Sequence, residues 1–77
     1  ELRARDWAYT RLVPLSKIVQ AHHSGITSRY ELAEFLGVTE EFLQAAIDRY
    51  REKYGTYTIV DGHIIYFNPL AVAEMFD

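Results

Sequence analysis

The side chains best suited to metal binding or proton transfer are three histidines, His22, His23 and His63. Imidazole binds transition metals and transfers protons near neutral pH, so a three-histidine zinc site is one alternative. His22 and His23 are adjacent, however, and adjacent residues on a helix point about 100° apart. His63 lies far along the chain, without the i, i+4 spacing of helical ligand pairs. We therefore predict that the helix-end histidines complement a helix dipole, and that this chain binds no metal by itself.

The sequence gives no stronger support for a catalytic nucleophile or for an acid–base pair than for a metal site. Ser16, Ser24 and Ser28 lack the glycine-rich elbow of a nucleophilic serine, and serine is favoured at helix caps and turns. Glu40 and Glu41 form a carboxylate pair, but they begin an amphipathic segment whose N-terminal end favours negative charge. We predict no catalytic residue and no bound cofactor in this chain.

The composition limits the chain to one small domain over residues 1–77. It has 77 residues, 49% of them hydrophobic, and no cysteine, so aromatic side chains rather than disulfides must fill the core. The longest apolar runs are far shorter than the roughly 18–20 residues that a membrane span needs, so we expect a soluble, cytoplasmic protein. The net charge of −3 disfavours general nucleic-acid binding, which usually shows a basic surplus.

Helical periodicity divides residues 2–54 into four segments. The first runs from Leu2 to Val13, because Pro14 cannot continue a helix, and the second runs from Leu15 or Ser16 towards Gly25. A Ser28-x-x-Glu31 capping box begins the third helix and Gly37 ends it, whereas Thr39 caps a long helix over residues 40–54. The predicted inward residues of the last three helices are Ile18, Val19, Ala21, Leu32, Ala33, Phe35, Leu36, Phe42, Leu43, Ala46, Ile47, Tyr50 and Tyr54.

The short link Gly37-Val38-Thr39 has helix-turn-helix spacing. Ala33 would let the two helices approach, Gly37 would permit a left-handed turn, and Val38 and Leu43 would fill the angle between the helices. The spacing therefore predicts helix-turn-helix geometry.

The charges of this unit do not suit DNA. In a DNA-binding helix-turn-helix, the start of the second helix faces the major groove, where Arg, Lys, Asn or Gln read bases. Here Glu40 and Glu41 occupy that end and would be repelled by phosphates, and only Gln44 resembles a base reader. We favour a structural or protein-binding unit, and DNA contact is the alternative.

A β-hairpin is predicted after the last helix. Asp61-Gly62 is a strong two-residue turn signal between the β-rich segments 56–60 and 63–67. The implied register pairs Tyr57 with Tyr66, Thr58 with Ile65, Ile59 with Ile64, and Val60 with His63. Asn68-Pro69 ends the hairpin, and residues 70–76 are predicted to form a short helix. The order indicates a mainly α protein with one β-hairpin (α+β), helix-turn-helix and winged-helix-like, with residues 56–67 as the wing.

Three segments of the chain also match the pattern of a known family. They are Glu1-x-x-Ala4-x-x-Trp7-Ala8 continuing to Leu12-Val13-Pro14, YELAEF at 30–35, and VTEEF at 38–42. Over about residues 1–54 the chain resembles the C-terminal part of ImmA/IrrE-type metallopeptidases, which regulate phages, other mobile elements and stress responses in bacteria. The family cleaves or inactivates a phage-type repressor, and its zinc-binding His-Glu-x-x-His helix lies upstream of the matching region.

The resemblance implies a division of labour. This chain has no His-Glu-x-x-His, so catalysis and zinc would belong to the parent protein, and this part would pack on the catalytic half and contact the repressor. Glu1 matches the family's third, carboxylate zinc ligand; the alternative is a solvated carboxylate at a helix start. Because Glu1 begins inside the amphipathic pattern without a capping residue, we expect a fragment of a longer chain.

Two other functions compete with this one. The first is a winged-helix DNA-binding module, which the Gly37 turn and the Asp61-Gly62 hairpin would suit. The second is a protein-interaction module that uses an exposed aromatic patch around Tyr57 and Tyr66, since Tyr is favoured at interfaces.

Overall fold

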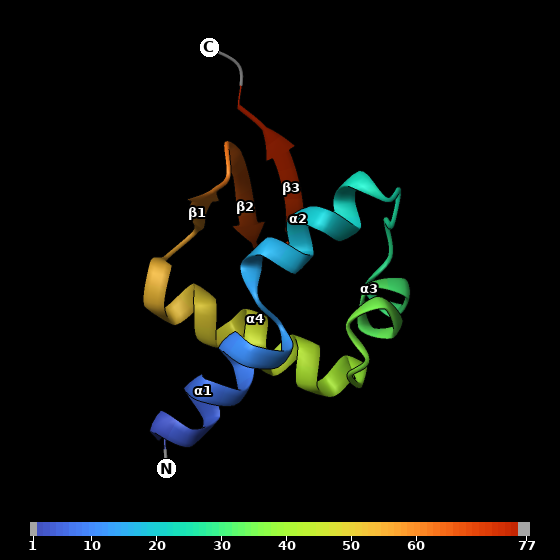
Figure 1. Ribbon diagram of the computed structural model, residues 1–77. Helices are drawn as coiled ribbons and strands as arrows, with labels where there is room; N and C mark the ends of the chain where they lie inside the picture. Colours follow the sequence, from blue (N-terminus) through green and yellow to red (C-terminus); the bar gives the residue numbers. More distant parts are fainter. Residues whose placement is uncertain (1, 76–77) are drawn as a thin grey trace.

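The computed structural model describes the backbone of residues 2–75 and the side chains of residues 6–75. Four helices are followed by three strands (Figure 1): α1 (Leu2–Leu12), α2 (Leu15–His23), α3 (Arg29–Leu36), α4 (Glu40–Tyr54), β1 (Tyr57–Val60), β2 (His63–Phe67) and β3 (Leu70–Glu74). This confirms a mainly α fold with an antiparallel β part. The winged-helix assignment stays a prediction.

The helix ends lie where local signals place them. Ser28 Oγ accepts a hydrogen bond from the Glu31 backbone N–H at 3.0 Å, and Thr39 Oγ1 accepts one from Phe42 N–H at 3.0 Å. Gly37 ends α3 with φ 74° and ψ 32°, the left-handed conformation that closes helices. Helices α3 and α4 are therefore joined by a short turn at Gly37, as the spacing predicts.

Helix α4 runs through the middle of the molecule and contacts α1, α3, β1 and β2 (Figure 1). It is central because four of its residues are buried: Leu43, Ala46, Ile47 and Tyr50. The rest of the core comes from the other elements and consists of Val13, Ile18, Val19, Ala21, Leu32, Ala33, Ile65 and Phe67.

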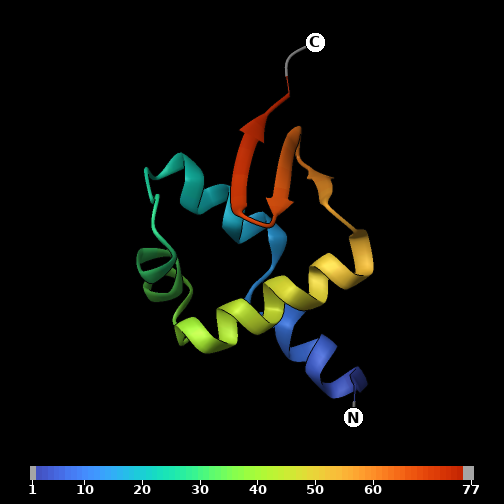
Figure 2. The ribbon, with the colours of Figure 1, turned by 180° about the vertical axis from the view of Figure 1, so that it is seen from behind.

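The sheet is an antiparallel meander in the order β1-β2-β3 (Figure 2). The predicted register of the first two strands is confirmed at all four pairs, from Tyr57–Tyr66 to Val60–His63. Asp61 and Gly62 take φ angles of 51° and 74°, as a tight hairpin turn requires. Ile65 and Phe67 lie on the buried face, whereas Tyr66 on the other face is exposed.

The predicted helix over residues 70–76 is wrong over its described part. Residues 70–74 form β3, which pairs along β2 from Phe67–Leu70 to His63–Glu74, and Phe76 lies outside the described residues. Pairing with β2 satisfies the backbone groups of an otherwise open strand edge. It also turns Leu70 and Val72 towards the core. These tertiary contacts outweigh the weak helix signal of Pro69 and the alanines.

Two inward assignments need correction. Phe35 is 41% exposed, because α3 packs through Leu32, Ala33 and Leu36, and Phe35 lies beyond the edge of that face. Tyr54 is also largely exposed at the end of α4, although its ring stacks on Phe67 with a centroid distance of 6.4 Å.

Helix α1 packs on α4 through Tyr9 and Asp6. Tyr9 contacts Phe42 with ring centroids 5.3 Å apart, and Asp6 forms an ion pair with Arg49. Trp7, which is 63% exposed, and Leu12, which is 46% exposed, stay outside the core. These two apolar side chains are therefore open to solvent, whereas Val13, directly after the helix, is fully buried.

Candidate functional site

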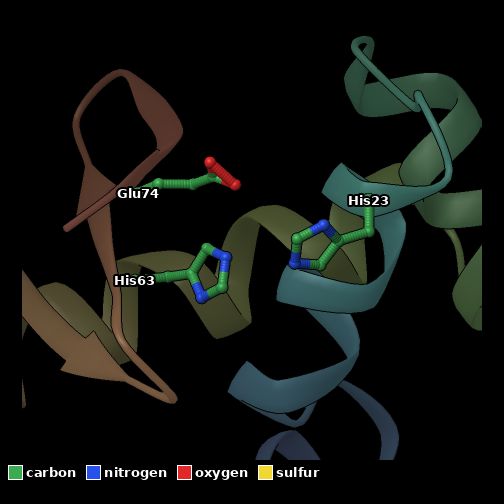
Figure 3. A group of neighbouring side chains, drawn as sticks. All are labelled: His23, His63 and Glu74. Carbon is green, nitrogen blue, oxygen red and sulfur yellow. The ribbon is translucent and has the colours of Figure 1, made fainter. Parts of the chain in front are cut away.

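Two histidines and a glutamate from distant segments meet at one place on the surface (Figure 3). His23 lies in the last turn of α2, His63 begins β2, and Glu74 ends β3. One ligand atom from each side chain lies within 4.8 Å of the corresponding atoms of the other two. The three groups form a compact set of potential metal donors.

Strand pairing positions two of these residues. His63 and Glu74 are direct partners in the β2–β3 register, so their side chains lie on the same face of the sheet. Helix α2 packs beside the sheet and places His23 opposite this pair. The ring centroids of His23 and His63 are 4.8 Å apart, and the two ring planes are perpendicular. Figure 3 shows the Glu74 carboxylate and the His63 ring both extending towards His23.

The His63 ring is oriented by the hairpin turn. Its Nδ1 lies 2.8 Å from the carbonyl oxygen of Asp61, and because a carbonyl only accepts, Nδ1 must carry the proton. In the neutral ring this leaves a lone pair on Nε2. This Nε2 atom is buried, and it has no hydrogen-bond partner among the described residues.

Two features of the sequence hide this arrangement. The expected alternative of a three-histidine site included His22, but the His22 side chain lines a separate cleft between α2, α3 and β3. Glu74 lies in the segment predicted to be a helix, and that prediction hid its cross-strand pairing with His63. Recognising residues 70–74 as a strand would have identified the pair. Glu1, the zinc ligand implied by the resemblance, lies outside the described residues.

The exposed start of α4 has an acidic character. The negative charge of Glu34, and to a smaller extent that of Glu40, raises the pKa of Tyr30 above its usual value. Gln44, the predicted base reader, accepts a hydrogen bond from Arg29 and donates one to Asp48 at 2.8 Å. The side chain at this position is therefore held by its neighbours.

The predicted protein-binding tyrosines lie together on the outer face of the sheet. Tyr57 and Tyr66 are cross-strand neighbours with ring centroids 6.2 Å apart, and Ile59 beside them is 53% exposed. We call Tyr57, Ile59 and Tyr66 the outer sheet patch. By contrast, Tyr50 and Phe67 are buried, and their stacked rings join α4 to the sheet.

No protein-family model, curated protein or solved structure matches this chain. The resemblance to the metallopeptidase family therefore stays a prediction from the residues. Within residues 2–75, no helix has both the length and the apolar character required to cross a lipid bilayer.

Proposed function

We propose that this chain is the non-catalytic C-terminal part of a repressor-inactivating zinc metallopeptidase in the cytoplasm. It packs on the catalytic half and helps to hold the repressor, while zinc and catalysis belong to that half. The observation that carries the proposal is the outward face of α1 around Trp7, a residue of the family-like pattern whose side chain is 63% exposed.

Helical geometry explains why this face is available. At 100° per residue, Trp7 points about 100° away from Asp6 and about 160° away from Tyr9, the two residues that contact α4. Within the domain, the Trp7 ring is approached by the guanidinium of Arg11, 5.2 Å from the ring centroid. A largely exposed tryptophan is typical of a protein-contact surface.

The outer sheet patch supports a second contact, with the repressor. Its two tyrosines and one isoleucine provide rigid apolar surface with hydroxyl groups at the edge, a composition enriched at protein interfaces. The charges on α4 favour a protein partner over DNA, because Glu40 and Glu41 would lie against phosphates in a helix-turn-helix complex.

Fluorescence of Trp7 tests the main contact, because Trp7 is the single tryptophan of the chain. We expect a His-Glu-x-x-His segment to be encoded upstream of residue 1. When the purified catalytic half that contains it is added, with its own tryptophans replaced by Phe, the emission of Trp7 should shift to shorter wavelength. Trp7→Ala should weaken binding at least about tenfold.

Tyr30→Ala serves as the matched control, since Tyr30 is also exposed but lies on α3. It should bind like the unchanged chain. The absence of an upstream His-Glu-x-x-His segment, an unchanged Trp7 emission, or equal losses in the two variants would contradict the proposal. For the repressor contact, Tyr57→Ala combined with Tyr66→Ala should reduce repressor binding without reducing binding to the catalytic half.

A further inference from the structure

We propose that His23, His63 and Glu74 bind a divalent transition-metal ion of the Zn²⁺ type, which links the end of α2 to strands β2 and β3. This site is independent of the peptidase zinc and of the proposed function above. All three ligands come from the described part of this chain.

The donor set selects the class of metal. Two imidazole nitrogens and one carboxylate oxygen suit Zn²⁺, Co²⁺ or Ni²⁺, whereas Mg²⁺ and Ca²⁺ prefer oxygen ligands alone. Three protein ligands also leave one position of a tetrahedral ion for water or for a donor from a partner.

His63 is prepared to act as the anchoring ligand. Its Nδ1–H donates to the Asp61 carbonyl, which orients the ring, as outer-shell partners of metal-bound histidines usually do. The opposite nitrogen, Nε2, is buried without a hydrogen-bond partner, an arrangement that costs free energy unless another group supplies an interaction. A bound cation would supply it.

The other two ligands have the freedom to close on the ion. Tetrahedral Zn²⁺ with bonds near 2.1 Å needs ligand atoms about 3.4 Å apart. The present separations of up to 4.8 Å must therefore shrink by about 1.4 Å at most. His23 and Glu74 are exposed at element ends, so side-chain rotation can provide this movement.

The local field also favours a cation. His23 lies in the last turn of α2, where the helix dipole presents partial negative charge, and Glu74 adds a full negative charge. A dication here is therefore favoured by both groups.

Calorimetric titration of the purified 77-residue chain with ZnCl₂, after treatment with EDTA, tests the site. We expect one Zn²⁺ per chain with micromolar or tighter affinity. Saturating Zn²⁺ should raise Tm by at least about 5 °C, since the ion binds only the folded arrangement, and EDTA should reverse the rise.

Exposed ligands allow variants that preserve the fold. His23→Ala and Glu74→Gln should each weaken Zn²⁺ binding at least about tenfold and reduce the rise in Tm. His22→Ala and Glu41→Gln are the matched controls, because they remove the same residue types outside the group. Both should bind Zn²⁺ like the unchanged chain.

Millimolar binding in the unchanged chain, or an unchanged Tm with Zn²⁺, would overturn the proposal. Equal weakening by His22→Ala and His23→Ala would also overturn it, since an adjacent surface histidine pair would then be the ligand.

Discussion

Tyr50 is the residue at which the helices and the sheet are joined. Its side chain is 3% exposed, and its hydroxyl donates to the backbone carbonyl of Val13 at 2.8 Å, which ties α4 to the end of α1. Its ring stacks on Phe67 of the sheet, with centroids 6.2 Å apart. Burial, with a smaller effect from neighbouring Tyr54, raises the pKa of Tyr50 from 10.0 to about 12.

The pKa of Tyr50 predicts a loss of stability in alkali. Because the folded-state pKa is raised, the contribution of Tyr50 is complete below about pH 10 and declines as the pH rises towards 12. Tyr50→Phe should lower the free energy of unfolding by about 1 kcal/mol at neutral pH, through the lost hydrogen bond. It should also lose less stability than the unchanged chain between these pH values. Urea unfolding followed by circular dichroism at neutral and alkaline pH measures both effects.

Tyr57→Phe is the matched control, since Tyr57 is exposed on the outer sheet patch. It should keep the full alkaline loss of the unchanged chain. An identical alkaline loss in Tyr50→Phe would show that the titration of Tyr50 does not drive it.

At the scale of elements, α1 depends on few contacts with α4. Arg49 donates to Asp6 in a bidentate pair, with Nε–Oδ1 at 2.6 Å and Nη2–Oδ2 at 3.0 Å. These hydrogen bonds hold the pKa of Asp6 below its usual value. Further links are the Tyr9–Phe42 ring contact and the Tyr50 hydroxyl, which lies 3.3 Å from the carbonyl oxygen of Tyr9 and 2.8 Å from that of Val13.

We therefore predict that α1 detaches first in acid. Because the folded-state pKa of Asp6 is lowered, its contribution is present at neutral pH and is lost as the pH falls below the usual value of 3.8. Asp6→Asn should cause the same loosening at neutral pH. Amide hydrogen exchange should become faster in α1 but not in α3.

Glu52→Gln is the control for this experiment, because Glu52 contacts Arg49 only at 3.4 Å and from within α4. Exchange in α1 should stay slow in this variant. Faster exchange throughout the domain in Asp6→Asn would instead indicate that α1 unfolds together with the rest.

The turn between α3 and α4 permits a prediction about backbone strain. Gly37 has φ 74°, and a Cβ atom added there would meet no atom within 4 Å. Gly37→Ala should therefore cost only the strain of a left-handed alanine, about 1 kcal/mol, and lower Tm by about 4–8 °C. Gly37→Asn should cost less, because Asn tolerates this conformation better. Equal Tm values for the two variants in a thermal scan would contradict the argument.

At the scale of the whole molecule, negative charge disfavours DNA binding, although α3 and α4 have helix-turn-helix spacing. The chain carries a net charge of −3, and both Glu40 and Glu41 are exposed at the start of α4. We expect no retention on duplex DNA, even at low salt, because phosphate contacts dominate such binding.

Charge reversal provides the sharper experiment. Because α3 and α4 have helix-turn-helix spacing, Glu40→Lys combined with Glu41→Lys should introduce weak DNA retention that disappears as salt is raised. Glu52→Lys combined with Asp48→Lys makes the same charge change away from the start of α4 and should be retained less. Retention of the unchanged chain on DNA would favour the winged-helix alternative.

Most of the local architecture was predictable, and the reasons are specific. The caps Ser28 and Thr39, the stop at Gly37 and the Asp61-Gly62 turn each act on residues a few positions away. The hairpin register then followed, because a two-residue turn leaves one way to pair the strands. By contrast, the formation of β3 depends on the free edge of β2, and the exposure of Phe35 depends on how α3 packs. The periodicity of apolar residues does not indicate either of these contacts.

The amino-acid sequence alone determines where the helices end, where the hairpin lies and most of the residues that α2 and α4 bury. Capping and turn formation act over about four positions along the chain, so neighbouring residues are sufficient. Tertiary structure alone decides which face of α1 is left open, as Asp6 and Tyr50 make contacts across 43 and 37 positions. It alone also brings His23 to the His63–Glu74 strand pair. Such meetings depend on how separately formed elements pack, and no local pattern of residues encodes them.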